Sequence, residues 1–254
     1  MPAVKRPLIV IPTYNERDNI GSLIPAILEA GSRCHILVVD DGSPDHTAGA
    51  VLALKRDGYG SQLFLESRPR KMGVGSAYIK AFRWGQAQGY DFLIQMDADW
   101  SHHPRYLETM IESAQEADFV IGSRYVPGGG TCNWGPGRLL LSRFGTLSAR
   151  TILGTDVADM TGGFNGWKPE VLQKIDLDTV QSDGYCFQIE MKYRAHQLGF
   201  RHLEFPILFD ERRAGQSKMS AAIALEACWR VWQLKLMRAS HVGRAEAGQP
   251  SRKS

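Results

Sequence analysis

The 254-residue sequence has few cysteines, and they form no recognisable pairs. Cys34, Cys132, Cys186 and Cys228 lie far apart and contain no C-x-x-C motif. A disulfide framework is built from many cysteines in a short secreted chain, and a zinc site needs ligands at short spacing. The sequence therefore predicts reduced thiols, as in the cytosol, and neither a disulfide-built nor a zinc-stabilised domain.

The sequence also lacks a long hydrophobic run. A membrane-spanning helix needs about 20 apolar residues, but the best candidate, Met219 to Leu225, is followed by Glu226 and then Arg230. Only a few apolar residues follow Pro7 at the N-terminus, too few for the core of a signal peptide. We therefore expect neither a transmembrane helix nor a signal peptide.

The chain lacks a net charge outside its C-terminal residues. The formal net charge is +3, and residues 238–254 alone carry +3, so the remainder is neutral. A protein that wraps nucleic acid needs a basic face on its folded domain, so no nucleic-acid partner is expected. The length favours one large domain. We predict a single domain over residues 1–238 and a basic disordered tail over 239–254.

Short apolar runs alternate with helical patterns through the first half of the chain. The runs, which are typical of strands buried on both faces, are Leu8 to Ile11, Ile36 to Val39, Leu63 to Leu65, Phe92 to Ile94 and Phe119 to Ile121. Between the first two, apolar residues from Ile20 to Leu28 recur on one helix face. This alternation predicts an α/β fold, a doubly wound and mostly parallel sheet with helices on both faces.

The pattern changes after Gly122. We expect a glycine-rich loop at 128–130, a helix from about Arg138, a loop around 161–163, a helix from about Tyr185, and a strand over Leu203 to Phe209.

A C-terminal amphipathic helix is expected over Ser217 to Arg238. Leu225, Trp229, Trp232 and Leu236 follow spacings of 4, 3 and 4, with basic residues beside them. Two tryptophans with basic neighbours suit a membrane interface, while packing against the domain or a partner subunit is an equal alternative.

Acidic and polar residues follow three of the predicted strands, at 11–16, 39–43 and 96–99. Ligands of open α/β sheets bind beyond the carboxyl ends of the strands. Asp97 and Asp99 are two apart in an extended segment, so both side chains can point the same way. Two carboxylates suit Mg²⁺ or Mn²⁺ that bridges phosphates, which predicts a nucleotide-diphosphate site.

Competing motifs do not fit. Gly73 and Gly75 precede a helix, but Tyr78 stands where a dinucleotide fingerprint needs a third glycine, and no phosphate-binding P-loop sequence occurs. The two glycines predict instead a close backbone approach at a helix N-terminus. His102 and His103, followed by a proline, are interpreted as the start of a helix and not as metal ligands.

Taken together, the motifs resemble those of the polyprenol (dolichol) phosphate mannosyltransferases, inverting GT-A glycosyltransferases of family 2. The resemblance runs from about Leu8 to Leu236. It rests on Ile11 to Glu16, Val39 to Ser43, Met96 to Pro104, Gly122 to Tyr125, Gly184 to Met191, Arg212 and Gly215 to Lys218.

The resemblance implies a GT-A (Rossmann-like) fold and the transfer of mannose from GDP-mannose to a polyprenyl monophosphate, with Mg²⁺ or Mn²⁺ as cofactor. The residues implied to bind the nucleoside are Pro12, Tyr14, Glu16, Val39 and Asp41. Those implied at the diphosphate are Asp97, Ala98 and Asp99, with Asp97 and Asp99 on the metal, and Arg124, Arg212 and Lys218 on phosphates. Catalysis is implied for Asp99, Arg124, Arg212 and Lys218.

Arg124, Arg138 and Ser142 are implied to meet the acceptor phosphate. Arg138 and Ser142, at i and i+4, share a helix face, whereas Leu140, Phe144, Leu147 and Thr151 form a separate stripe. Two positions depart from some relatives, which carry Gln where Ser101 stands and a basic residue where Asn165 stands.

The acceptor chemistry removes the need for a general base, because a lipid phosphate is already an anion near neutral pH. Glu190 is therefore interpreted as a buried or paired structural carboxylate. The lipid substrate implies a peripheral protein at the cytoplasmic face of a membrane, with a membrane-anchoring subunit as a further possible partner.

Three other functions remain open from the sequence. A polyprenyl-phosphate glucosyltransferase using UDP-glucose would share the fold and the two-aspartate motif. A non-catalytic nucleotide-sugar-binding subunit is a more distant alternative. A phosphatase or phosphomutase is disfavoured because Trp100 and Ser101 replace the Gly-Thr expected after its catalytic aspartates.

Overall fold

A computed structural model of the chain describes residues 3–31, 33–210 and 229–236. The strands are β1 (Pro7–Thr13), β2 (His35–Asp40), β3 (Leu63–Ser67), β4 (Phe92–Gln95), β5 (Phe119–Ser123), β6 (Gly130–Thr131), β7 (Asn165–Trp167), β8 (His202–Pro206) and β9 (Leu208–Phe209). The α-helices are α1 (Arg17–Ala30), α2 (Thr47–Leu54), α3 (Val74–Ala87), α4 (Leu107–Ser113), α5 (Pro136–Leu153), α6 (Pro169–Ile175) and α7 (Gly184–Gln197). Short turns of other helix types are η1 (Lys55–Tyr59), η2 (Pro104–Tyr106) and η3 (Leu177–Thr179).

The main sheet has seven strands in the order β3-β2-β1-β4-β7-β5-β8, and β6 pairs with β9 in a small second sheet. Every pairing in the main sheet is parallel except those of β7, which runs antiparallel to both β4 and β5. The predicted α/β architecture and the five predicted strands of the first half are confirmed.

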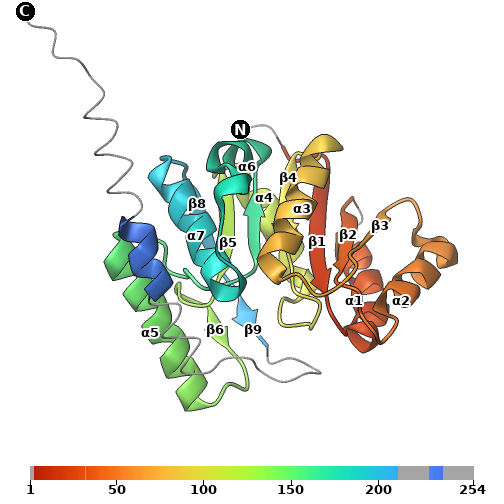
Figure 1. Cartoon of the computed structure of the whole chain (residues 1–254), viewed down its shortest axis with the longest axis horizontal. Helices are drawn as coiled ribbons and strands as arrows, with labels where there is room; N and C mark the ends of the chain where they lie inside the picture. Colours follow the sequence, from red (N-terminus) through yellow and green to blue (C-terminus); the bar gives the residue numbers. More distant parts are fainter. Residues whose placement is uncertain (1–2, 32, 211–228, 237–254) are drawn as a thin grey trace, which may run out of the picture.

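Helices cover both faces of the main sheet (Figure 1). Side chains along β1 alternate between two buried clusters. Leu8 and Val10 join the cluster formed with α3, α6 and α7, whereas Ile9 and Ile11 join the one formed with α1 and α4. Because both faces are buried, the strand is an unbroken apolar run and not an alternating one.

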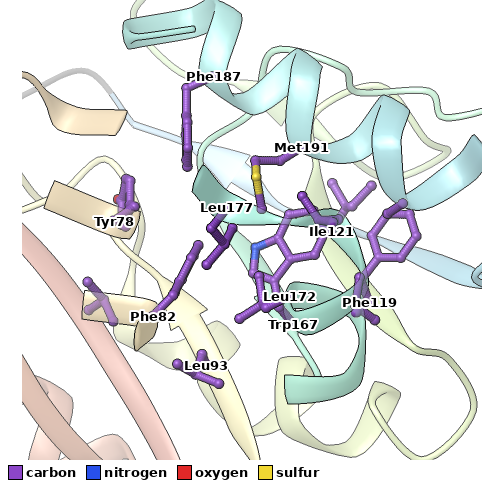
Figure 2. Packing of buried hydrophobic residues seen from close by; sticks show 14 of the residues in the cluster. Tyr78, Phe82, Leu93, Phe119, Ile121, Trp167, Leu172, Leu177, Phe187 and Met191 are labelled. Carbon is purple, nitrogen blue, oxygen red and sulfur yellow. The ribbon is translucent and has the colours of Figure 1, made fainter. Parts of the chain in front are cut away.

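Trp167 occupies the middle of the first of these clusters (Figure 2). Its ring stacks on Phe119 at a centroid distance of 5.1 Å, and its indole Nε1 donates a hydrogen bond to Oε1 of Gln95 at 2.8 Å. A buried indole needs such an acceptor. Trp167 therefore ties the antiparallel strand β7 to its neighbours β4 and β5.

The second half differs from the prediction in several elements. The single strand expected over Leu203 to Phe209 is divided between β8 and β9, which lie in different sheets. The division falls at Ile207, whose N–H still donates to the Ser123 carbonyl of β5 at 3.0 Å while its carbonyl accepts the Gly130 N–H of β6 at 3.0 Å. From Leu208 the chain pairs with β6. Strands β6 and β7 and helix α6 were not predicted, and β6 forms in part where a glycine-rich loop was expected.

The C-terminal helix is described only in part. Residues 229–236 are helical and lie beside α5 (Figure 1), and Val231 joins the buried cluster that contains Leu153 of α5. The rest of the predicted helix and the predicted tail lie outside the described residues. No helix within the described ranges is long and apolar enough to span a bilayer.

Candidate active site

The three acidic strand ends lie on one rim of the sheet, as predicted. In the parallel ladders Thr13 of β1 stands opposite Asp40 of β2, and Val10 stands opposite Gln95 of β4. The ladder continues one residue beyond β4, where the Met96 N–H donates to the Val10 carbonyl at 3.1 Å. The segments that follow β1, β2 and β4 are therefore neighbours.

Asp97 and Asp99 lie in a turn held by its own residues. The Asp97 N–H donates to Nδ1 of His102 at 3.1 Å, and the Ser101 N–H donates to Oδ1 of Asp99 at 3.1 Å. Burial lowers the pKa of His102 although Asp97 and Asp99 oppose that shift, so the imidazole is neutral and can accept through Nδ1. His102 thus supports the turn, and His103 begins η2 by accepting from the Arg105 N–H, as the helix-start prediction required.

The donor set of this turn fits a divalent cation. The Asp97 side chain is 37% exposed, while Asp99 is buried. The buried Ser101 hydroxyl has no hydrogen-bond partner within the described part of the chain. Among the described residues no group of three or more His, Cys, Asp and Glu side chains forms a metal site. Two carboxylates and a hydroxyl are oxygen ligands of the kind that Mg²⁺ and Mn²⁺ prefer, and these ions can take their remaining ligands from water and phosphate.

The predicted nucleoside residues gather at the ends of β1 and β2. Tyr14 is partly exposed and has Nζ of Lys71 4.5 Å above its ring. Glu16 accepts a hydrogen bond from the Asn19 side chain at 2.8 Å. Pro12 lies beside them in β1, but the Val39 side chain is fully buried in the core, which leaves only its backbone for a ligand.

Asp41, the fifth of these residues, is engaged by the protein itself. Its carboxylate forms an ion pair with buried Arg68 and accepts the Met72 N–H at 2.9 Å. Arg68 also donates to the carbonyl of Gly73 at 2.9 Å. Sequence reasoning missed Arg68 because its partner lies 27 residues earlier in the chain. Asp41 and Arg68 together join the end of β2 to the loop before α3.

Arg124 is buried and pairs with Asp159, a residue that was not predicted to take part in the site. Its Nε and Nη2 donate to the two carboxylate oxygens of Asp159 at 2.8 and 2.7 Å, and Nη2 also donates to Oγ1 of Thr161 at 2.8 Å. Burial alone would raise the pKa of Asp159, but the charge and hydrogen bonds of Arg124 lower it to about 2. This two-point contact fixes the plane of the guanidinium.

Arg138 and Ser142 lie on one side of α5, as their spacing predicted, and each contacts an aromatic residue that lies near Arg124. Ser142 is buried and its hydroxyl accepts from the Tyr125 hydroxyl at 2.7 Å. The guanidinium carbon of Arg138 lies 3.9 Å from the ring centre of Trp134, and that of Arg124 lies 5.6 Å from the same ring. The Trp134 indole therefore contacts both cations, an interaction that favours positive charge. Trp134 was not predicted.

Glu190 is buried and paired, as its interpretation as a structural carboxylate requires. It is buried, forms an ion pair with Arg194 at 2.6 Å, and accepts the Ser182 N–H at 3.0 Å. Asn165 is also buried, and its amide donates to Gln95, Gln188 and the Gly162 carbonyl. Asn165 thereby links the end of β4 to the loop before β7 and to α7.

Eleven of the thirteen predicted site residues, counting the Val39 backbone and Ala98 between the two aspartates, lie within the described part of the chain. The other two, Arg212 and Lys218, lie outside the described residues.

Sequence comparison relates the chain to glycosyltransferases. Residues 8–176 match the model of glycosyl transferase family 2. A polyprenol monophosphomannose synthase of Mycolicibacterium smegmatis is 44% identical over 237 residues, which cover 91% of this chain and 88% of that protein. An undecaprenyl-phosphate mannosyltransferase of Micrococcus luteus is 43% identical, covering 87% of this chain and 90% of that protein.

Solved structures share the fold at lower identity. Glucosyl-3-phosphoglycerate synthase of Mycobacterium tuberculosis, in complex with Mn²⁺, UDP and glucosyl-3-phosphoglycerate, superposes with a TM-score of 0.63 at 20% identity, covering 98% of this chain and 82% of that chain. A mannosyltransferase of Pyrobaculum calidifontis, in complex with GDP-Man and Mn²⁺, gives a TM-score of 0.57 at 16% identity, covering 98% and 77%.

Proposed function

Because the chain belongs to glycosyl transferase family 2, we propose that it transfers mannose from GDP-mannose to a polyprenyl monophosphate with inversion at the sugar. The product would be a lipid-linked mannose donor for glycan or glycoprotein synthesis. Mannosyl transfer to a polyprenyl phosphate is supported by the two relatives at 43–44% identity over nearly their whole length.

One observation in this chain carries the proposal. The two-aspartate turn lies on the same rim as the proposed nucleoside residues. Buried Arg124 follows the end of β5, and half-buried Trp134 and Arg138 lie just before and at the start of α5. A site for a nucleotide sugar needs the first part, and a phosphate acceptor needs the second. The arrangement supports the proposal because it offers residues for both parts.

Asp97 and Asp99 would hold Mg²⁺ or Mn²⁺, with Ser101 as a candidate third ligand. When bound, the cation would neutralise charge on the leaving diphosphate. Arg212 and Lys218 are proposed to face the same phosphates. Tyr14, Glu16, Pro12, and the backbone at Val39 and Asp41 are proposed to hold the guanosine.

The remaining residues orient the nucleophile. A phosphate oxygen is already anionic near neutral pH, so catalysis needs a positioned cation and no proton acceptor. Arg124, Arg138 and Ser142 are proposed to bind that phosphate. Asp159 keeps the Arg124 guanidinium in one orientation before substrate arrives, which lowers the ordering cost of binding.

The lipid acceptor calls for a membrane surface, and α5 offers a face for it. Leu140, Phe144 and Leu147 are 58–71% exposed on one side of this helix, and Trp229, Trp232 and Leu236 of the neighbouring helical segment are 51–64% exposed. Neither α5 nor residues 229–236 contain an acidic residue, and together they carry five basic ones. Apolar and basic groups without acidic ones fit an anionic bilayer surface. These residues support our proposal that the protein is peripheral, at the cytoplasmic face of a membrane.

The test is transfer with a panel of nucleotide sugars. Purified protein is incubated with radiolabelled GDP-mannose, UDP-glucose or another donor, a polyprenyl phosphate and Mn²⁺, and the label in the organic phase is counted. We expect label only from GDP-mannose, and loss of it in Asp99→Asn with a folded Glu112→Gln control retaining it. Label from UDP-glucose instead would identify a glucosyltransferase, and nucleotide binding without transfer from any donor would identify a non-catalytic subunit.

A further inference from the structure

Lys192 of α7 is a fully buried cation that the proposed function does not use. Its Nζ donates to the main-chain carbonyls of Asp159 at 2.7 Å and Gly162 at 2.8 Å, with that of Met160 at 3.5 Å. All three carbonyls belong to the turn between α5 and β7. An ammonium group taken out of water must be compensated in this way, because burying it alone is costly.

The charges around Lys192 come from several elements. Asp159 is in the turn itself, Glu204 is on β8, and Arg124 follows β5. Glu204 accepts the N–H groups of Ala158 and Asp159. Burial lowers the pKa of Lys192 to about 8, Asp159 and Glu204 oppose that shift, and Arg124 adds to it. The turn thus contains one acidic group, Asp159, and is contacted by Glu204 and by the buried cations Lys192 and Arg124.

This turn lies between the two parts of the candidate active site. At one end Asp159 and Thr161 bind the Arg124 guanidinium. At the other end lies Gly163, where a side-chain Cβ would stand 3.8 Å from Oδ2 of Asp97 and 3.5 Å from His102. The two-aspartate motif keeps its own contacts, from the Asp97 N–H to His102 and from the Ser101 N–H to Asp99. A shift of the turn at Asp159 would therefore displace Arg124 and leave that motif in place.

We propose that Lys192 is a positioning residue for sugar transfer: its ammonium group fixes the turn from Asp159 to Gly162 and, through Asp159, holds the Arg124 guanidinium in the orientation that meets the acceptor phosphate. The proposal rests on the proposed function, since it assigns Lys192 a part in the same site. Lys192 touches no substrate.

The first experiment compares Lys192→Met with Lys174→Met, which removes an exposed lysine from α6. Both full-length proteins are checked for a cooperative thermal transition and for GDP binding in the presence of Mn²⁺ by calorimetry. Steady-state rates are then measured against polyprenyl phosphate. A misplaced phosphate-binding group should lower kcat/KM for the acceptor about ten-fold or more in Lys192→Met. GDP affinity in that variant and all parameters of Lys174→Met should stay within about two-fold of the wild type.

The second experiment asks whether Lys192 acts through Arg124. In an Arg124→Gln background the guanidinium is already gone, so adding Lys192→Met should change acceptor kcat/KM by less than about two-fold. A purely structural role would lower both GDP binding and transfer, and would do so equally in the two backgrounds. That equal loss would overturn the proposal.

If Lys192→Met does not fold, Lys192→Gln is measured in its place. Lys192→Gln keeps an N–H donor without the charge, and should show a smaller loss in the same direction. A folded Lys192→Gln or Lys192→Met with wild-type acceptor kinetics refutes the role of Lys192 while leaving the proposed function intact. A wild-type protein that transfers no sugar refutes both.

Discussion

The carboxylate of Asp183 accepts a hydrogen bond from the N–H of Gly75 at 2.7 Å, although the two residues are 108 positions apart. Gly75 lies in the first turn of α3, where backbone N–H groups have no partner within the helix. A protein carboxylate therefore occupies the helix N-terminus that a dinucleotide-binding fold would offer to a phosphate. This contact explains physically why the two glycines before Tyr78 are not a dinucleotide fingerprint.

Gly75→Ala should destabilise the protein. A Cβ at this position would stand 2.9 Å from the Ser182 carbonyl and 3.0 Å from the Phe187 ring, so the backbone must shift. We expect a loss of about 1–3 kcal/mol of unfolding free energy in urea, although Ala is the better helix former.

The matched control is Gly21→Ala in α1, where a Cβ would meet nothing within 4 Å. That substitution should leave stability unchanged or raise it by up to about 1 kcal/mol. Equal effects of the two substitutions would show that Gly75 makes no close approach.

Glu190→Gln should lower stability without changing how the rate depends on pH. The substitution removes the charge that pairs with Arg194 and weakens the acceptor of the Ser182 N–H, for a loss of about 1–3 kcal/mol. Because no proton acceptor is needed, the pH profile of kcat should keep its shape, with exposed Glu112→Gln as the control. Disappearance of one limb of the profile in Glu190→Gln would identify Glu190 as a general base.

The pairing of Asp159 with Arg124 should make stability depend on pH in acid. Despite the opposing effect of burial, Arg124 lowers the pKa of Asp159 from 3.8 to about 2, so the contribution is present above about pH 4 and is lost as the pH falls through 2. The stability gap between the wild type and Asp159→Asn should therefore shrink by about 2 kcal/mol over that interval. Urea unfolding at a series of pH values measures it, and a gap independent of pH would contradict the assignment.

The exposed face of α5 should control membrane binding. Changing Leu140, Phe144 and Leu147 to serine removes three apolar side chains, each of which contributes on the order of 1–2 kcal/mol if it enters the bilayer. Flotation with anionic liposomes should fall about ten-fold or more, and the remaining binding should weaken with salt because its basic part is screened.

Leu52→Ser is the control for that experiment, since Leu52 is an exposed leucine on the distant helix α2. If the triple serine variant floats like the wild type, α5 does not face the bilayer. If the wild type floats only with another membrane protein present, the same face docks a partner subunit.

Local sequence determined the first half of the fold and the acidic rim. Unbroken apolar runs such as Leu8 to Ile11 can be read directly because both faces of a parallel sheet are buried. The positions of Asp97 and Asp99 follow from the strand that precedes them. The spacing of Arg138 and Ser142 was also enough to predict that they share a helix face, because a helix places residues i and i+4 on one side.

Only the tertiary structure decided which polar groups act together. Asp159 reaches Arg124 across 35 residues, Lys192 reaches the same turn from α7, and neither contact leaves a periodic signal in the sequence. The antiparallel strand β7 was missed for a similar reason, since its three residues become a strand only when β4 and β5 supply partners on both sides. The composition of α5 gave its two faces, but the packing of the whole domain decided that the apolar one is left to the solvent.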